Sequence, residues 1–389
     1  MKSATRDIKI YFFLLGIFSF LFLSCKEESN PVTQVPDTSY EMKVTFAPIE
    51  VKSTDGKINL LYSVEIPNFE KDGYTLKDFQ VLNAANNTRL CSISDTGKYL
   101  LIHPPTTASI PEQLYAYPMF GHATYRFSIG LVLDPAQVPQ KIKHRLVLLK
   151  DAKETTIEAA ETAVSKEPVT IVGAPFKGNG FVSECTTAFL PFNHHPTYQL
   201  TYKGMTRVAE RYCVDWLKVD SAGNLFHGDK TICSNWYVYG QNIYAATAGE
   251  VVFVQDGMPD QSPVGTVNDV NLYNGTGNSV TIMTGVSYAV YGHMIANSIT
   301  VKLGEYVNKG QLIGRVGNSG NSNAPHLHFG IHSEFPYYIS EGLPYYIDSF
   351  EKAGLLVNPN LEGGTLVLLP SPSARTNELM ENCGVYNFK

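Results

Sequence analysis

Short apolar runs bounded by turn residues recur along almost the whole chain, and none of them keeps a helical period. From Tyr40 to Lys166 they include "INLLYSVEI", "LKDFQVL" and "YRFSIGLVL". Apolar residues that recur at every second position are typical of half-buried strands. About seven such strands in succession predict an N-terminal β-sandwich of immunoglobulin type over residues 40–166. Its last stretch, residues 151–166, fits either a short helix or another strand.

The second half of the chain has more glycine at its turns. From Pro175 onward, apolar runs such as "GEVVFVQDG", "NSVTIMTG" and "SYAVYGHM" alternate with Gly- and Asn-containing turns. This pattern predicts a second β domain over residues 167–351. We expect residues 352–389 to form a C-terminal extension with a short helix within Ser373–Gly384. The predicted fold class is therefore mainly β, in two domains.

The N-terminus carries a pattern that is typical of export signals. Three basic residues precede an apolar stretch, Ile10–Leu23, which is shorter than the roughly 20 residues that a membrane-spanning helix needs. The stretch ends in "FLSC", which resembles a bacterial lipobox, so we expect a signal peptide over residues 1–24 and lipidation of Cys25. The alternative is an ordinary secretory peptide with an incidental cysteine. Residues 25–39 then form a tether to the membrane.

Lipidation would anchor the protein in the cell envelope. We expect the outer membrane, on either its periplasmic or its surface face, because "CKEES" at Cys25 resembles the export tag of surface lipoproteins in some Gram-negative bacteria. The formal net charge is −6 and no basic run is present, which argues against nucleic-acid binding. The sequence indicates no oligomeric state.

The remaining cysteines bear on both disulfides and metal binding. Besides Cys25 the chain has five, at positions 91, 185, 213, 233 and 383. An oxidising compartment permits disulfides, but an odd number leaves at least one cysteine free. No C-x-x-C pair is present, so we expect no zinc site built from cysteines.

The stretch "NSGNSNAPHLHFGIH", Asn318–His332, carries two histidines on either side of one leucine. In a strand, Leu327 and Phe329 would face a core, whereas His326 and His328 would face the other way, ~7 Å apart. One imidazole could then bind a metal while its neighbour acts beside that metal. Taken alone, the pattern fits a solvent-facing pair of histidines better.

Two further residues give this histidine pair a context. His293 ends the apolar run "YAVYGHM", and Asp215 lies inside the apolar run of "ERYCVDWLKVD". An acid between Val214 and Trp216 should not be buried without a partner. We therefore expect Asp215 to contact a cation, a hydrogen-bond network or a metal.

The region from Pro175 to Glu351 resembles the LytM/lysostaphin-type zinc metallopeptidases. The resemblance is carried by "YAATAGEVV", "GNSVTI", "YAVYGHM", "KLGEYVNKGQLIGRVGNSG" and "PHLHF", in this order. It implies a β-sheet fold, the duplicated hybrid motif, and cleavage of peptidoglycan stem or cross-bridge peptides with a Zn²⁺ cofactor. It also implies that Asp215 and His328 are zinc ligands and that His326 and His293 are catalytic.

These groups suit metal-assisted hydrolysis of an amide. Two imidazoles and one carboxylate leave a fourth position on zinc open for water. His326, next to a ligand, would take a proton from that water and return it to the leaving amine. His293 would orient the water or hydrogen-bond the tetrahedral oxyanion. No G-x-S-x-G, H-E-x-x-H or P-loop motif competes with this interpretation.

One position departs from the family pattern. The usual first ligand lies four residues before the aspartate, where this chain has Arg211, and arginine stays protonated and cannot bind zinc. A family subgroup with similar segments carries its histidine some twenty residues upstream. We therefore favour His195 as the third ligand, with His194 as the alternative and His227 as a remote candidate.

Other interpretations stay open at this point. If the third ligand is missing, the second domain would be an inactive LytM-like regulator or a peptidoglycan-binding scaffold. The sandwich could also carry the main function, as an adhesion or carbohydrate-binding module. We expect His332 to lie at the rim of the site, and the scattered histidines of the first domain (His103, His122 and His144) to be structural or on the surface.

Overall fold

The computed structural model describes residues 40–96, 100–103, 124–184, 195, 199–202, 205–271, 273–360 and 362–389. The expected signal peptide, the lipidation site Cys25 and the tether lie outside the described residues, as do His122, Cys185 and His194. No described segment forms a helix long and apolar enough to cross a membrane. The helical turns in the described ranges are short 3-10 turns: η2 (Phe69–Asp72), η3 (Ile93–Asp95), η4 (Pro135–Gln137), η6 (Cys233–Asn235) and η7 (Tyr337–Ile339).

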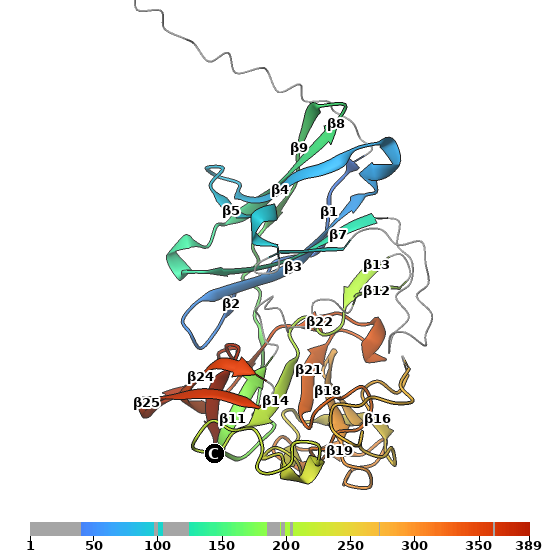
Figure 1. Cartoon of the computed structure of the whole chain (residues 1–389), viewed down its shortest axis with the longest axis vertical. Helices are drawn as coiled ribbons and strands as arrows, with labels where there is room; N and C mark the ends of the chain where they lie inside the picture. The colour runs from blue at the N-terminus through green and yellow to red at the C-terminus, as the bar shows by residue number, and fades with distance from the viewer. Residues whose placement is uncertain are drawn as a thin grey trace, which may run out of the picture.

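The N-terminal domain is a sandwich of two antiparallel sheets (Figure 1). One sheet has the order β1 (Lys43–Phe46), β3 (Ile58–Pro67), β7 (Thr124–Leu133), β6 (Leu100–His103), with β2 (Val51–Lys52) also on β3. The other has the order β5 (Arg89–Ser92), β4 (Thr75–Asn83), β8 (Lys141–Lys150), β9 (Lys153–Ala163). A shared core holds Tyr62 and Phe127 of the first sheet and Phe79 and Leu146 of the second. The β-sandwich is thus present, and its immunoglobulin type stays a prediction.

The C-terminal domain is built on one 11-stranded sheet. From one edge its strands are β19 (Tyr306–Val307), β16 (Gly249–Gln255), β17 (Asn278–Thr284), β18 (Ser287–Met294), β21 (Leu327–His332), β14 (Val214–Lys218), β11 (Gly178–Glu184), β26 (Gly384–Phe388), β24 (Phe350–Asn360) and β25 (Gly363–Arg375), with β22 (Gly342–Leu343) also on β21. Three two-stranded sheets accompany it: β10 (Thr170–Val172) with β23 (Tyr345–Ile347), β12 (Gln199–Tyr202) with β13 (Met205–Val208), and β15 (Asn242–Tyr244) with β20 (Leu312–Arg315). The mainly β fold class is confirmed.

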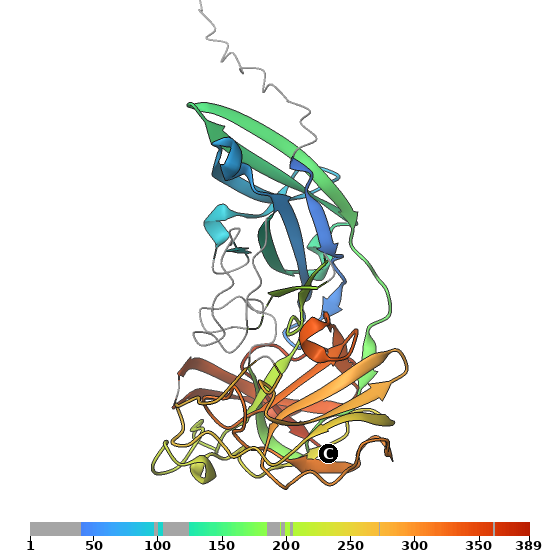
Figure 2. The same cartoon turned by 90° about the vertical axis from the view of Figure 1, so that its right-hand side faces the viewer.

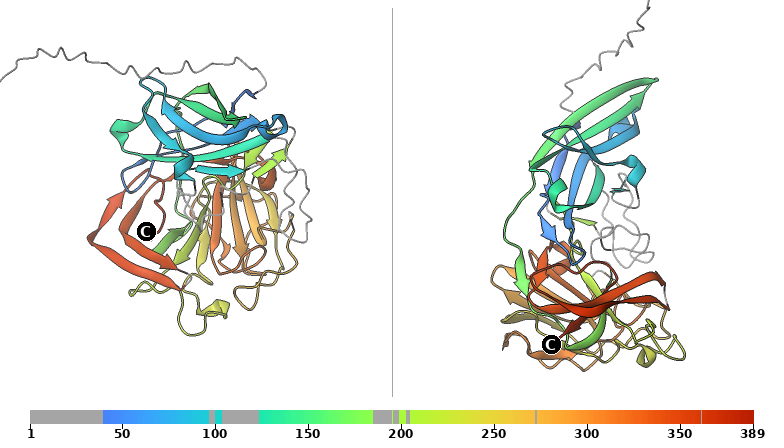
Figure 3. Two further views of the ribbon diagram at one scale, coloured as in Figure 1. Left: turned by 45° about the horizontal axis from the view of Figure 1, so that its top comes forward. Right: turned by 90° about the vertical axis from the view of Figure 1, so that its left-hand side faces the viewer.

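Residues 352–389 belong to this large sheet. Strand β26 lies between β11 and β24, and the long hairpin of β24 and β25 forms one edge of the sheet (Figure 3). The short helix expected within Ser373–Gly384 is wrong, because β25 runs to Arg375 and an irregular segment leads to β26. An extended backbone lets Leu379 and Met380, which are neighbours in sequence, enter two different apolar clusters.

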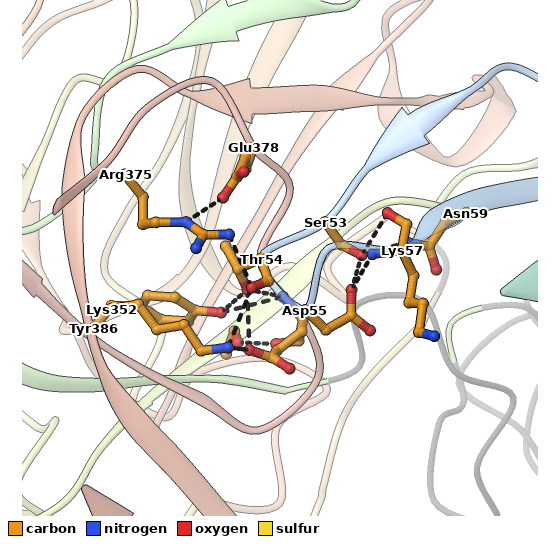
Figure 4. Close-up of polar contacts among 11 residues, drawn as sticks. Ser53, Thr54, Asp55, Lys57, Asn59, Lys352, Arg375, Glu378 and Tyr386 are labelled. Carbon is orange, nitrogen blue, oxygen red and sulfur yellow. Dashed lines mark hydrogen bonds and ion pairs between the residues drawn. The ribbon is translucent and has the colours of Figure 1, made fainter. Parts of the chain in front are cut away.

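The two domains contact each other directly. Residues 151–166, left open between helix and strand, form β9, and the chain then descends along one side of the molecule into β10 (Figure 2). An apolar cluster joins Val51 and Leu61 of the sandwich to Tyr212 and Leu379. Beside it, the turn at Thr54 contacts side chains of β24, β25 and β26 (Figure 4).

Candidate metal centre

The site lies on the face of the large sheet that is turned away from its apolar core. Strands β14 and β21 pair antiparallel, with Asp215 opposite His328. Their neighbours Val214, Trp216, Leu327 and Phe329 are fully buried in the core. Because successive side chains in a strand point to opposite faces, Asp215 and His328 must share the other face. The sequence "HLHFGI" predicted that core-facing and site-facing side chains alternate along the strand. This alternation is confirmed from Leu327 onward.

Three potential metal ligands converge at this point. Nδ1 of His328 lies 2.9 Å from Oδ1 of Asp215, and Nε2 of His195 lies 3.2 Å from Oδ2 of the same carboxylate. One donor atom from each residue lies within 4.8 Å of the other two. The exposed fractions are 0% for His195, 5% for Asp215 and 4% for His328. In the described part of the chain this is the one cluster of three or more such side chains.

The donor set and its geometry fit a zinc ion. Atoms that each lie ~2.0–2.1 Å from a tetrahedral zinc are about 3.4 Å from one another, close to the two measured separations. Nδ1 of His195 is 3.2 Å from the carbonyl oxygen of Cys213, so that nitrogen carries the proton and the lone pair of Nε2 faces Asp215. Two imidazoles and one carboxylate are the ligand types of catalytic zinc sites.

His326 and His293 stand beside this cluster. Nε2 of His326 lies 3.6 Å from Oδ1 of Asp215, and the rings of His293 and His326 are 4.5 Å apart. Nδ1 of His326 donates to the carbonyl oxygen of Ala324 at 2.8 Å, and Nδ1 of His293 to that of Ser319 at 2.7 Å. In both neutral rings, Nε2 is therefore left as a proton acceptor on the site side.

The backbone at His293 is specialised for this placement. His293 has φ 62°, a left-handed conformation that is rare for residues other than glycine and is common at functional sites. Its neighbour Gly292 lies opposite His328 across the β18–β21 pair. Since Gly292 has no side chain, the face beside His328 stays open to the ring of His293.

Burial and mutual contact set the charges in the site. Burial lowers the pKa of His293 well below its usual value, and the nearby His326 and His328 lower it further. Burial also lowers the pKa of His326. Burial alone would raise the pKa of Asp215, but the contacts with His195 and His326 hold it well below its usual value. At neutral pH the site therefore combines the carboxylate of Asp215 with the neutral imidazoles of His293 and His326, so it is able to bind a cation and to accept protons.

Comparison with known proteins relates the C-terminal domain to a family of peptidases. Residues 236–338 match the model of Peptidase family M23. The chain contains an M23 peptidase domain. The matched range includes His293, His326 and His328, whereas His195 and Asp215 precede it. The resemblance to the LytM/lysostaphin-type family is thereby confirmed.

Solved structures similar to parts of this chain include a prophage-encoded M23 protein. The catalytic domain of the antimicrobial peptidase lysostaphin from Staphylococcus simulans is 24% identical, with a TM-score of 0.23, over 37% of this chain and 80% of that one. A mutant catalytic domain of the prophage-encoded M23 protein EnpA from Enterococcus faecalis is 22% identical, with a TM-score of 0.21, over 33% of this chain and 92% of that one. Helicobacter pylori Csd3 is 15% identical, with a TM-score of 0.25, over 76% of this chain and 73% of that one.

Arg211 points away from the centre of the M23 site. Its guanidinium Nε lies 2.5 Å from Oε1 of Glu341, and its Nη2 donates to Oγ of Ser63 in the sandwich at 3.0 Å. The position of the usual first ligand thus contacts the other domain, while His195 reaches Asp215 from elsewhere. The remote candidate His227 is exposed, packs on Tyr237 and is not part of the cluster.

The expected rim position of His332 is wrong. Its side chain is fully buried, with Nδ1 2.9 Å from Oγ of Ser340 and Nε2 3.7 Å from Sγ of Cys213. The segment after β21 folds back over it, and the ring of Tyr337 packs against it. Burial lowers the pKa of His332 to about 3. His144 is likewise a buried structural histidine, as expected, between Tyr62 and Ala160.

Two acids beside the M23 site were missed from the sequence. Glu184 on β11 lies opposite Asp215, and burial together with the charge of Asp215 raises its pKa to about 7. Glu210 is buried, and burial raises its pKa as well. The signal was the one used for Asp215, an acid among apolar residues, in "GFVSE" and "VAERYC". Glu184 extends the polar row of Asp215 and His328 and is able to hold a proton there near neutral pH.

The cysteines that the structure describes take no part in the metal cluster. The four described cysteines, Cys91, Cys213, Cys233 and Cys383, are free. Cys213 lies near the centre, but burial raises the pKa of its thiol well above the usual value. It therefore stays a protonated packing group, and its carbonyl oxygen holds His195.

Proposed function

We propose that the protein is a zinc-dependent endopeptidase that cleaves stem or cross-bridge peptides of peptidoglycan. The observation that carries this proposal is the buried His195–Asp215–His328 cluster with His293 and His326 beside it. Membership of the M23 family supports a peptidase. The peptidoglycan substrate follows from the LytM/lysostaphin resemblance, and one of the similar structures is that of an antimicrobial peptidase.

The protein groups have separate tasks in this reaction. A zinc ion held by His195, Asp215 and His328 would polarise the scissile carbonyl and make water more acidic. His326 has its Nδ1–H fixed on Ala324, so its Nε2 accepts the proton of the attacking water and delivers it to the leaving amine. His293 has its Nδ1–H fixed on Ser319, so its Nε2 accepts a hydrogen bond from the attacking water and orients it.

The test is cleavage of purified muropeptides by the full-length protein. We expect product with about one zinc per chain, loss of product after chelation, and recovery when zinc is added back. Stoichiometric zinc without cleavage would instead support the inactive, peptidoglycan-binding alternative. Absence of zinc binding would overturn the proposal itself.

We further propose that the protein is lipid-anchored through Cys25 in the cell envelope. The support is the lipobox-like "FLSC" after an apolar stretch. Labelling with radioactive palmitate in the producing cell should mark the protein, and the Cys25→Ala variant should stay unlabelled and leave the membrane fraction. Equal labelling of both forms would contradict the anchor.

A further inference from the structure

A short segment of the M23 domain touches both the sandwich and the metal centre. It runs from Thr206 to Cys213 and leads directly into β14, which carries Asp215. The sandwich meets it with two residues of β3, Ser63 and Glu65, which share one face of the strand because they are two positions apart. The hydroxyl of Thr206 donates to the carboxylate of Glu65.

Arg211 is the main polar link between this segment and the sandwich. Its guanidinium is 4% exposed, pairs with Glu341 at 2.5 Å, donates to Ser63 at 3.0 Å and lies 4.9 Å from the centre of the Phe46 ring. Glu341 is buried as well, and its second oxygen accepts from the backbone N–H of Val208 at 3.1 Å. A buried guanidinium held by these contacts keeps little conformational freedom, so it restrains the backbone that carries it.

The backbone contacts the metal centre only two residues after Arg211, at Cys213. Tyr212 packs into the apolar cluster with Val51 and Leu61 of the sandwich. The next residue, Cys213, receives the Nδ1–H of His195 on its carbonyl oxygen at 3.2 Å. The carbonyl oxygen of Cys213 thus orients His195. The two residues before Cys213, Arg211 and Tyr212, both contact the sandwich.

We propose that Arg211 is a positioning residue which, through Ser63, makes the docked sandwich part of the support of the His195 ligand. The sandwich then affects metal affinity without touching the metal site. This inference rests on the proposed zinc centre, and its consequences are measurable in the zinc-free protein as well. It also gives a physical reason for an arginine at the position of the usual ligand.

The test compares zinc affinity, by competition with a chelator, in full-length variants. We expect Arg211→Met to bind zinc about 10- to 100-fold more weakly than the wild type, the range for groups that orient a ligand. Ser63→Ala, a change confined to the sandwich, should weaken binding about fivefold. In zinc-free protein with ¹⁵N-labelled histidine, both variants should show a smaller fraction of His195 with its proton on Nδ1.

Thr54→Val is the matched control, since it also removes one sandwich hydroxyl at the domain contact. The Thr54 hydroxyl is 2.7 Å from that of Tyr386 and accepts from the backbone of Glu381 (Figure 4). It should leave zinc affinity within about twofold of the wild type. The positioning role of Arg211 would be overturned if Ser63→Ala kept the wild-type zinc affinity and the wild-type tautomer of His195. An equal loss of zinc affinity in Thr54→Val would overturn it as well. Failure of the wild type to bind zinc would instead refute the metal centre.

Discussion

Asp215 and His328 occupy directly opposed positions on β14 and β21, and their side chains meet at 2.9 Å although 113 residues separate them in the chain. This pairing across two central strands is the basis of the site. Each residue is flanked by core side chains that fix the strand faces, so neither can turn away without disrupting the sheet.

Replacing the carboxylate should abolish metal binding while keeping the shape of the site. Asp215→Asn removes the negative charge between the imidazoles. We expect zinc affinity to fall by more than about 100-fold, beyond the usual effect of changing a group that merely orients a ligand. Competition with a chromophoric chelator measures it. His227→Gln, at an exposed histidine, serves as the control and should bind zinc normally; an Asp215→Asn protein with wild-type affinity would place the metal elsewhere.

Removing the proposed general base should separate chemistry from metal binding. His326→Gln is expected to lower kcat by about 10²- to 10⁴-fold, the usual contribution of a positioned acid–base group. Zinc affinity should stay close to that of the wild type, because His326 lies outside the three-ligand cluster. Muropeptide cleavage and zinc titration are measured on the same preparation. A loss of zinc that parallels the loss of kcat would assign His326 to the ligands instead.

The side chains packed against Gly330 of β21 should not tolerate a methyl group at this position. A Cβ there would overlap Sγ of Cys213 and lie 2.9 Å from Nε2 of His332. We expect Gly330→Ala to lower the free energy of unfolding by about 1–3 kcal/mol. The same change in a Cys213→Ala background should cost clearly less, since the overlapping sulfur is gone. Equal costs in both backgrounds, measured by urea unfolding, would show that this contact is not the cause.

Much of the site could be predicted from local patterns. An acid inside the apolar run around Asp215 and alternating histidines after a glycine-rich turn are both visible in the sequence, and each implies a side chain on the polar face of a strand. His195 was favoured from a resemblance, and it does lie against Asp215. The role of Arg211 could not be predicted, because its partners Ser63 and Glu341 are more than 100 residues away on either side.

The errors have the same non-local origin. β26 pairs with β11 across some two hundred residues, so no local pattern indicates that Gly384–Phe388 lies inside the sheet. His332 lies on the same face of β21 as His328, because an even number of positions separates them. The loop that buries His332 follows the strand and carries Ser340 and Tyr337. Position along a strand predicts which face a side chain occupies, whereas its exposure depends on which other segments of the chain cover that face.

The sandwich should lose stability at mildly acidic pH through His144. Burial lowers the pKa of His144 to about 4 from its ordinary 6.5, although the hydrogen bonds to the backbone of Ala160 and Ala159 raise it in part. The unfolded state therefore binds the proton first as pH falls. The contribution is fully present above pH ~6.5 and is lost between pH ~6.5 and ~4, by about 3 kcal/mol in total.

Urea unfolding at pH 7 and pH 4 of the wild type and His144→Gln measures this effect. The variant keeps one donor and one acceptor but has no titrating group. Its stability should change less with pH than that of the wild type, by about 3 kcal/mol. Parallel pH dependence in the two proteins would mean that His144 does not control acid sensitivity.

The central claim is that one ion joins the acid of β14 to the imidazole of β21. Anomalous X-ray diffraction at the zinc edge, on crystals of zinc-loaded protein, locates that ion directly. We predict a single strong peak at ~2.0–2.2 Å from the donor atoms of His195, Asp215 and His328. A peak bound by other residues, or no peak while Asp215 and His328 keep their direct 2.9 Å contact, would contradict the account.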